Sequence, residues 1–240
     1  MKGGGGAVAL TDGWEQEAEN WVRWTRTPGH DVYWHYRAPF FDQIVPAPGR
    51  QTLEIGCGEG RVERDLAARG HTVTGVDASP TLLRYARGAD PAGRYIDADA
   101  AALPFPDGAF DLVVAYNSLM DIADMPGAVH EAARVLAPGG RFCVCETHPV
   151  SDAGGFDGTA PDAAFTIRGS YLESRPSDNT FERDGLRMTF HGRTHPLEDY
   201  ARALEGAGFL IERVREPAAP PEAVAARVGY RRWQRVPMFL

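Results

Sequence analysis

The sequence has almost no lysine, little cysteine and no long apolar run, and each scarcity excludes a class of protein. Lys2 is the only lysine, and 33 acidic against 25 basic residues leave a net charge of −8. Nucleic-acid binding requires a basic surface, so no nucleic-acid partner is expected. No apolar stretch has the length of a membrane span or of a signal peptide, which predicts a cytoplasmic protein without a membrane partner.

The cysteines argue against a disulfide framework. Cys57, Cys143 and Cys145 are odd in number and contain no C-x-x-C pair. This usage fits a reducing cytosol, and no metal site is expected. Cys143 and Cys145 stand two apart in a strand-like run, where they share one face and behave as small core residues.

What is present is an ordinary globular composition in 240 residues, with 43% apolar and 24% charged residues, enough for one α/β domain. Between residues 51 and 147, apolar strand-like runs alternate with helical stretches. This repetition predicts a Rossmann-like, doubly wound parallel sheet with helices on both faces. The expected strands span residues 51–56, 71–77, 94–99, 110–117 and 141–147.

The alternation breaks between residues 149 and 196, which we interpret as an insertion covering the functional edge of the sheet. Two strand-like runs are expected at 165–175 and 185–195, separated by the turn-rich SDNTFERDG. After the insertion come a helix at 197–208, a strand at 209–217, a Pro/Ala-rich link at 218–226 and a last strand at 235–240. The expected division is a flexible tail at 1–10, a helical cap at 11–48, and a main domain at 49–240 with its insertion at about 149–196.

A glycine-rich turn, LEIGCGEGR at residues 53–61, is the most informative motif. Gly56, Gly58 and Gly60 join a strand to a helix, where side chains would block a ligand and the helix start offers free N–H groups. Asp77, at the end of the second strand, is placed to accept both ribose hydroxyls of an adenosine. Asp99, at the end of the third strand, is placed to accept from an adenine amino group. The three strand ends together predict a nucleotide-like site.

Two other functions are compatible with a nucleotide-like site. A dinucleotide-dependent oxidoreductase prefers G-x-G-x-x-G, but the third glycine position of that pattern is occupied here by Arg61. A non-catalytic nucleotide-binding module is the second alternative. The intact Gly56, Gly58, Asp77 and Asp99 argue against a module that has lost its ligand.

At these residues the sequence resembles class I S-adenosylmethionine-dependent methyltransferases, in particular small-molecule enzymes of the methyltransferase domain 11 type. LEIGCGEGR resembles their motif I, and VDAS their ribose-binding motif. DADAAALPFPDGAFDLVVA is similar to the adenine-binding and fourth-strand signature, and EAARVLAPGGRF to the helix and turn before the fifth strand. The resemblance implies a seven-stranded, mostly parallel sheet with an antiparallel last strand.

The resemblance also implies S-adenosylmethionine as the cofactor, with S-adenosylhomocysteine as its product. It places the donor's ammonium near Glu54, its methionine portion on the glycine turn, its ribose at Asp77 and its adenine at Asp99. The complete set of implied donor contacts is Glu54, Gly56, Gly58, Asp77, Ala78, Ser79, Asp99, Ala100 and Asn117.

An aromatic stretch, NWVRWTRTPGHDVYWHYRAPFF at residues 20–41, precedes the first strand. Its rings are interpreted as the wall and lid of an acceptor pocket, because aromatic faces suit a planar substrate and attract cations such as a sulfonium. The alternative is an ordinary core helix. The expected acceptor contacts are Trp21, Trp24, Tyr33, Trp34, Tyr36 and, from the insertion, Phe190.

Methyl transfer requires few specific catalytic residues, so the sequence contains no obligatory catalytic motif. An in-line methyl transfer needs alignment and exclusion of water, and it needs a general base only when the nucleophile loses a proton. His148 is favoured as a base because it follows the fifth strand and titrates near neutrality. The other candidates are Tyr33, His35 and Tyr36. For each of them, a hydrogen-bonded, exposed or core side chain is the competing interpretation.

The predicted function is methyl transfer to a small aromatic or heteroaromatic metabolite, phenol-like or indole-like, in natural-product biosynthesis. O-, N- and C-methylation all stay open, although C-methylation would fit the absence of an obvious base. The protein is expected to be a monomer or a homodimer.

Overall fold

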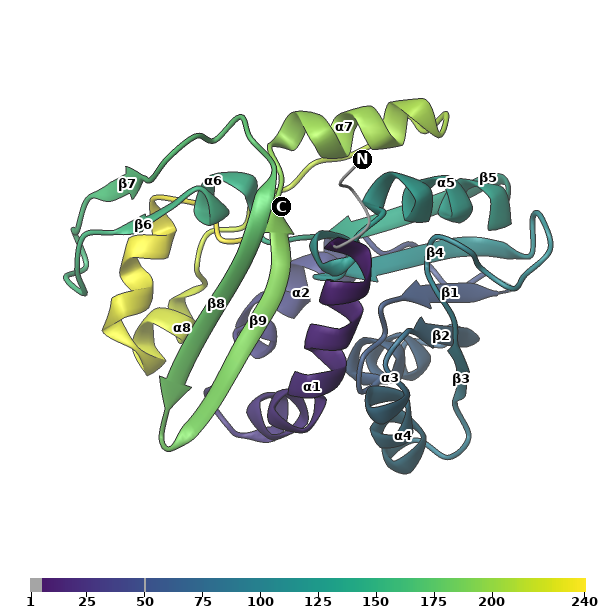
Figure 1. The fold of residues 1–240 in the computed structure, drawn as a ribbon, viewed down its shortest axis with the longest axis horizontal. Helices are drawn as coiled ribbons and strands as arrows, with labels where there is room; N and C mark the ends of the chain where they lie inside the picture. The colour runs from purple at the N-terminus through teal and green to yellow at the C-terminus, as the bar shows by residue number, and fades with distance from the viewer. Residues whose placement is uncertain (1–5, 50) are drawn as a thin grey trace.

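A five-stranded parallel sheet forms the centre of the protein, in the strand order β3-β2-β1-β4-β5 (Figure 1). The computed structural model describes residues 6–49 and 51–240, and all neighbouring strands of this sheet run parallel, as predicted. The strands are β1 Thr52–Ile55, β2 Val73–Asp77, β3 Arg94–Asp97, β4 Phe110–Tyr116 and β5 Leu136–Cys145. The helical elements between them are α3 Arg61–Ala68, α4 Pro80–Ala89, the 3-10 turn η1 Leu119–Asp121 and α5 Met125–Val135.

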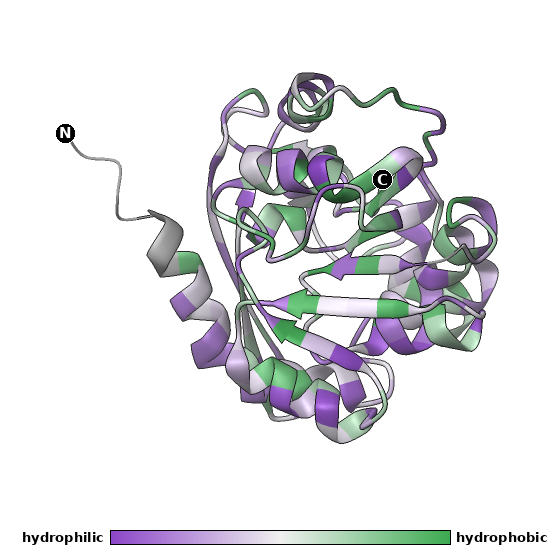
Figure 2. Cartoon of the chain, turned by 90° about the vertical axis from the view of Figure 1, so that its right-hand side faces the viewer, coloured by the Kyte–Doolittle hydropathy of each residue, from purple (hydrophilic) through white to green (hydrophobic). Residues whose placement is uncertain are grey.

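Both faces of the sheet are covered, and β4 shows how the sequence achieves this. Leu112 and Val114 pack on one face with α3 and with α2 (Tyr33–Gln43). Val113 and Ala115, which alternate with them, pack on the other face against α5. In Figure 2 the strands at the centre combine green and pale segments with a few purple ones, whereas the helices around them carry hydrophilic stripes. A strand that is apolar on both faces is the pattern expected of a covered parallel sheet.

The helix boundaries follow their local signals. Ser79 accepts a hydrogen bond from the Leu82 amide (3.1 Å) and Pro80 occupies the first turn of α4, so the predicted cap is confirmed. Gly70 follows α3 with a φ of 93°, the left-handed conformation expected of a helix terminator. These caps fix where α3 and α4 begin and end relative to the strand tips.

The expected sixth and seventh strands do not form in the described residues. Residues 210–217 are irregular, with Leu210 94% exposed, and side chains rather than a strand ladder hold them, as in the Arg141–Glu212 ion pair (3.1 Å). The expected last strand is reduced to one antiparallel bridge, between Thr147 and Phe239. The prediction of a seven-stranded sheet is therefore corrected to five parallel strands and a single antiparallel bridge at the β5 tip.

The insertion contains two antiparallel hairpins. The first joins β6 (Gly154–Phe156) to β7 (Phe165–Ile167), and the longer one joins β8 (Arg175–Arg183) to β9 (Leu186–Thr194). The sequence placed a turn over residues 177–185, but most of that segment is strand. The turn is only Asp184–Gly185, both at positive φ (50° and 77°), which is the Asp-Gly signal of a two-residue hairpin.

The N-terminal segment forms two helices beside the insertion. α1 (Gly6–Arg26) lies along the β8–β9 hairpin, as Figure 1 shows, and the Trp14 indole N–H donates to the His191 carbonyl of β9 (2.8 Å). Residues 1–5 of the expected tail lie outside the described residues, and residues 6–10 belong to α1. The other helical elements are α6 Pro149–Asp152, α7 Leu197–Gly206, α8 Pro221–Ala226 in the segment expected to be a link, and the 3-10 helix η2 Val228–Gln234.

Candidate functional site

The glycine-rich turn after β1 requires glycine at more than one position. Gly56, Gly58 and Gly60 all have positive φ (69°, 56° and 80°). A Cβ on Gly56 would lie 2.5 Å from the Ser118 Cβ, so the turn packs directly on the tip of β4. The nearest atom to a Cβ on Gly58 would instead be the Trp21 indole nitrogen, 3.6 Å away. Gly58 therefore leaves room for a ligand between the turn and α1.

Asp77 is held at the tip of β2 by the same turn. Its carboxylate accepts the amides of Gly58 and Ser79, each at 2.8 Å. Burial raises the pKa of Asp77 to about 6, despite these two hydrogen bonds. The Ser79 hydroxyl in turn donates to Glu15, which ties the ribose-side loop to α1.

Two buried acceptor atoms near the turn have no hydrogen-bond partner. They are Glu54 Oε2, on a side chain only 2% exposed, and Asn117 Oδ1, on a residue with a left-handed backbone (φ 51°). Burial, followed by the charge of Glu63, raises the pKa of Glu54 well above its usual range. Buried polar atoms are normally paired, so both point to a ligand with donor groups. An ammonium would satisfy them and favour the ionised Glu54.

One cavity of about 1040 Å³ connects these features. Every donor contact implied by the resemblance lines it, although those residues come from the ends of four strands. The lining residues of this set are Glu54, Gly56, Gly58, Asp77, Ala78, Ser79, Asp99, Ala100 and Asn117.

The aromatic wall of the cavity comes from α1 and β9. Trp21, Trp24 and Phe190 line the cavity as predicted, and Trp14 joins them. Phe190 is the centre of the cluster, with edge-on ring contacts at 5.7 Å to Trp21, 6.1 Å to Trp24 and 6.4 Å to Trp14. The periodicity of α1 could have identified Trp14, since it lies seven residues before Trp21 on the same helix face.

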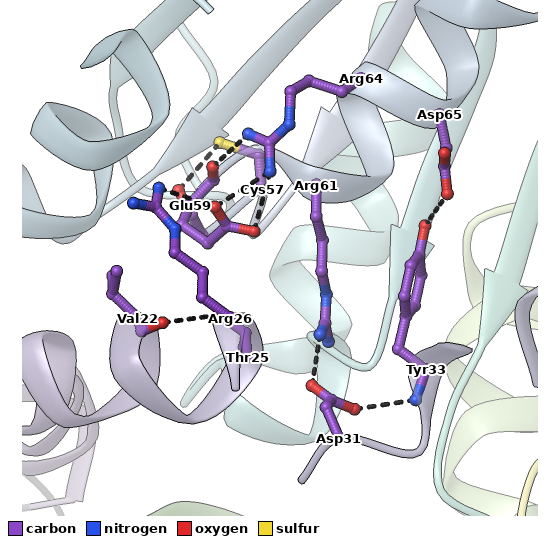
Figure 3. Close-up of polar contacts among 11 residues, drawn as sticks. Val22, Thr25, Arg26, Asp31, Tyr33, Cys57, Glu59, Arg61, Arg64 and Asp65 are labelled. Atoms are coloured by element: carbon purple, nitrogen blue, oxygen red, sulfur yellow. Dashed lines mark hydrogen bonds and ion pairs between the residues drawn. The ribbon is translucent and has the colours of Figure 1, made fainter. Parts of the chain in front are cut away.

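Four acceptor-side predictions are corrected because α2 turns its side chains away from the cavity. Tyr33 and Tyr36 are 1% and 2% exposed in the core, and the Tyr33 hydroxyl donates to Asp65 on α3, as Figure 3 shows. Burial raises the pKa of both phenols, so neither is a ready base. Trp34 is 50% exposed on the outer surface, and His35 packs edge-on against Tyr230 at 5.7 Å. None of these four lines the cavity.

His148 is also corrected as a catalytic candidate. Its Nδ1 caps α6 by accepting the Val150 amide (3.1 Å), and its Nε2 lies 2.8 Å from Glu216. The ring does not line the cavity. His148 follows β5, as the sequence predicted, but its side chain turns back to cap the next helix. Sequence position does not reveal that orientation.

Arg61 and Asp31 are cavity residues for which the sequence predicted no role in the site. Arg61 forms an ion pair with Asp31, drawn in Figure 3, and its guanidinium lies over the rings of Trp21 (5.0 Å) and Tyr33 (4.4 Å). The pair joins the start of α3 to the loop between α1 and α2. Asp121 and Asp152, which also line the cavity, were missed as well, because a polar residue at the end of a very short helix carries no sequence pattern.

No described helix has both the length and the apolarity to cross a membrane. In the described ranges, 6–49 and 51–240, no group of three or more His, Cys, Asp and Glu side chains is arranged to hold a metal ion.

Comparisons with known proteins agree with the geometry. Residues 53–144 match the family model described as a methyltransferase domain. The chain is 36% identical over 121 residues to a demethylmenaquinone methyltransferase of Tropheryma whipplei, covering 48% of this chain and 49% of that protein. It is 40% identical over 127 residues to a demethylmenaquinone methyltransferase of Thermus thermophilus, covering 50% and 57%. The matched region thus spans about half the length of these relatives.

A solved structure extends the likeness to most of the chain. The S-adenosylmethionine-dependent methyltransferase from Mesorhizobium loti superposes with a TM-score of 0.69 at 27% identity, covering 87% of this chain and 95% of that one. Residues 53–144 therefore form a methyltransferase domain of the class I S-adenosylmethionine-dependent type.

Proposed function

We propose that this protein transfers a methyl group from S-adenosylmethionine to a small aromatic or heteroaromatic acceptor. The observation that carries the proposal is the single cavity of about 1040 Å³, which joins the donor-side residues to the aromatic wall of Trp14, Trp21 and Phe190. Pockets for one ligand commonly have volumes of roughly 300–1,000 Å³, so this cavity has room for a donor and an acceptor together.

The residues present fit the donor. Glu54 and Asn117 supply the unpartnered acceptor atoms that an amino-acid ammonium needs, and Asp77 presents a half-buried carboxylate for ribose hydroxyls. Asp99 and Ala100 line the same cavity and would contact the adenine. S-adenosylmethionine, when bound, supplies an activated methyl group.

On the acceptor side, the protein orients the acceptor and excludes water. The α1 and β9 rings give flat apolar surfaces that orient a planar molecule and exclude water from the methyl-transfer path. The relatives from Tropheryma whipplei and Thermus thermophilus are named for demethylmenaquinone, and a small-molecule acceptor in this chain is consistent with that. Natural-product tailoring, by methylation at O, N or C, is the proposed role.

Calorimetric titration with S-adenosylmethionine and, separately, with NAD tests the donor. The proposal expects binding of S-adenosylmethionine and none of NAD. Asp77→Ala should weaken donor binding at least tenfold, because the ribose hydroxyls lose their acceptor. Asp107→Ala, at an exposed position paired with Arg134, is the matched control and should bind as the parent protein does. Failure of S-adenosylmethionine to bind would refute the enzyme proposal.

A further inference from the structure

Two carboxylates face the acceptor end of the cavity and have no assigned role. Asp121 ends η1, just beyond the tip of β4, and Asp152 ends α6, just beyond β5. Within the described part of the chain, neither side chain forms a hydrogen bond or an ion pair, although many other carboxylates do. Both carboxylates are therefore available to a bound molecule.

The cavity that they face is built for a ligand on independent grounds. Glu54, 2% exposed and lining the same cavity, has an oxygen without any hydrogen-bond partner, and so has Asn117, four residues before Asp121. Asn117 and Asp121 thus flank one strand tip, with the donor turn packed against Ser118 between them. This places Asp121 where donor and acceptor meet.

The backbone that carries Asp121 is held rigidly. The buried Glu146 carboxylate accepts the amides of Ser118 (3.3 Å), Leu119 (3.0 Å) and Met120 (3.5 Å), which clamps the whole turn. Gly192 of β9 packs against the Asp121 carboxylate, since a Cβ on Gly192 would lie 2.7 Å from Asp121 Oδ1. Such a support holds a side chain in one place, as a catalytic group requires.

The surroundings of Asp121 make its carboxylate basic. Burial raises its pKa well above the usual range, and the charges of Glu146, Asp152 and Asp77 act in the same direction. Burial also raises the pKa of Asp152, to about 7, while Arg175 on β8 opposes that shift. The charge of Asp121 also contributes to a raised pKa of Tyr200 on α7, after burial and the charges of Glu146 and Asp152. The negative charge of Asp152 thus disfavours ionisation of Asp121.

We propose that Asp121 is the general base of the methyl transfer and that the acceptor presents an O–H or N–H group to it. This inference rests on the proposed function. The acceptor heteroatom attacks the methyl carbon with its lone pair as its proton passes to Asp121, and the electron pair of the breaking C–S bond returns to sulfur. The products are the methylated acceptor, a neutral thioether and a protonated Asp121, which releases its proton to solvent.

Asp152 is a positioning residue in this scheme, since its negative charge keeps Asp121 basic. Asp152→Asn should leave donor affinity unchanged and move the acid limb of the kcat–pH profile to lower pH. A structural role alone would not move that limb. The proposal also makes C-methylation of an electron-rich ring the less suitable reaction, because attack by carbon needs no base beforehand.

The experiment compares the parent protein with Asp121→Asn and with the acid-to-amide control Asp107→Asn. Donor binding is measured by calorimetry, and folding by the urea midpoint. Methyl transfer is measured with labelled S-adenosylmethionine and three separate probes, namely tyrosol for O–H, tyramine for N–H and 1-methylindole, which has no N–H, for carbon. The expected result is transfer to tyrosol or tyramine, reduced at least about 100-fold in kcat by Asp121→Asn with donor affinity retained.

The outcomes separate the two proposals. If the parent protein does not bind S-adenosylmethionine, the proposed function fails. If the donor binds but kcat is unchanged in folded Asp121→Asn, or if only 1-methylindole or none of the probes is methylated, the base assignment is overturned and donor binding stands.

Discussion

Among individual residues, Gly56 shows how closely the donor turn depends on the absence of a side chain. Its φ of 69° and the 2.5 Å approach of a Cβ to Ser118 combine two separate costs. Gly56→Ala should destabilise the protein by roughly 2–5 kcal/mol, from left-handed backbone strain and overpacking, and abolish donor binding. Gly139→Ala is the matched control, with a similar φ of 79° and nothing within 4 Å of the Cβ.

The control should lose only the backbone contribution, roughly 1–2 kcal/mol, and keep its donor affinity. Urea unfolding and calorimetry measure the two effects. Equal stability losses in both variants would show that contact with Ser118 is not part of the requirement for glycine.

Asp77 predicts a pH dependence of donor binding. Its pKa of about 6 lies above the roughly 3.9 of an unfolded aspartate, so the folded protein binds this proton more tightly. The ribose hydroxyls need the ionised carboxylate, and donor affinity should therefore be full above pH 7 and fall below pH 6, by about tenfold at pH 5. In Asp77→Asn this limb should vanish. A persisting limb would assign the effect to another group.

The raised pKa of Asp77 also makes the free energy of unfolding depend on pH. Because the pKa of Asp77 is raised on folding, its contribution to the free energy of unfolding decreases as the pH rises from about 4 to 6. At neutral pH, ionisation of this half-buried carboxylate therefore lowers the free energy of unfolding.

Among the structural elements, the pairing of α1 with β9 decides the acceptor wall. Residues 20–41 were predicted to act as one aromatic surface, but the loop between α1 and α2 divides them. Trp21 and Trp24 on α1 face the cavity, whereas Tyr33 and Tyr36 on α2 enter the core. Substitutions in α2 should consequently affect stability rather than acceptor turnover.

Phe190→Ala tests the wall directly. Loss of edge-on contacts worth roughly 0.5–1.5 kcal/mol each should loosen the β8–β9 hairpin from α1 and raise the KM for the acceptor. Donor affinity, which depends on the strand tips, should change little. Ile167→Ala, a half-exposed position elsewhere in the insertion, is the control. Steady-state kinetics with an accepted probe and limited proteolysis of the hairpin provide the measurements, and an unchanged KM would remove Phe190 from the acceptor site.

In the whole molecule, the C-terminal residues close the sheet edge above the cavity. Leu240 and Glu146 exchange backbone hydrogen bonds (3.0 and 2.9 Å), and the His148 amide donates to Met238 (2.8 Å). Phe239, 3% exposed, packs against Tyr36 and lines the cavity. The chain thus returns from its far end to the strand tips that carry Glu146 and Asp121.

Phe239→Ala should therefore destabilise the whole fold, by roughly 3–5 kcal/mol as for other buried phenylalanines. Leu210→Ala, at a side chain 94% exposed, should stay within about 0.5 kcal/mol of the parent protein. Chemical denaturation measures both. A loss at Phe239 no greater than that at Leu210 would show that the C-terminal bridge is not part of the cooperative unit.

The sequence alone determined the parts of this protein that depend on short-range patterns. The alternation of strands and helices, the Ser79 cap and the Gly70 stop are local, because propensity and capping act over a few residues. The donor side was also readable, since parallel strands bring their carboxyl ends to one edge and each tip residue can be counted from its strand.

Only the tertiary structure decided the acceptor side. Whether Tyr33 or Trp21 reaches the cavity depends on how α1 and α2 pack. Whether Asp121 is basic depends on Glu146 from the tip of β5, Asp77 from the tip of β2 and Asp152 from α6. The missing sixth strand has the same origin, because residues 210–217 have strand-like composition but no backbone partner. Contacts between distant segments set all of these, and no local pattern records which segments will meet.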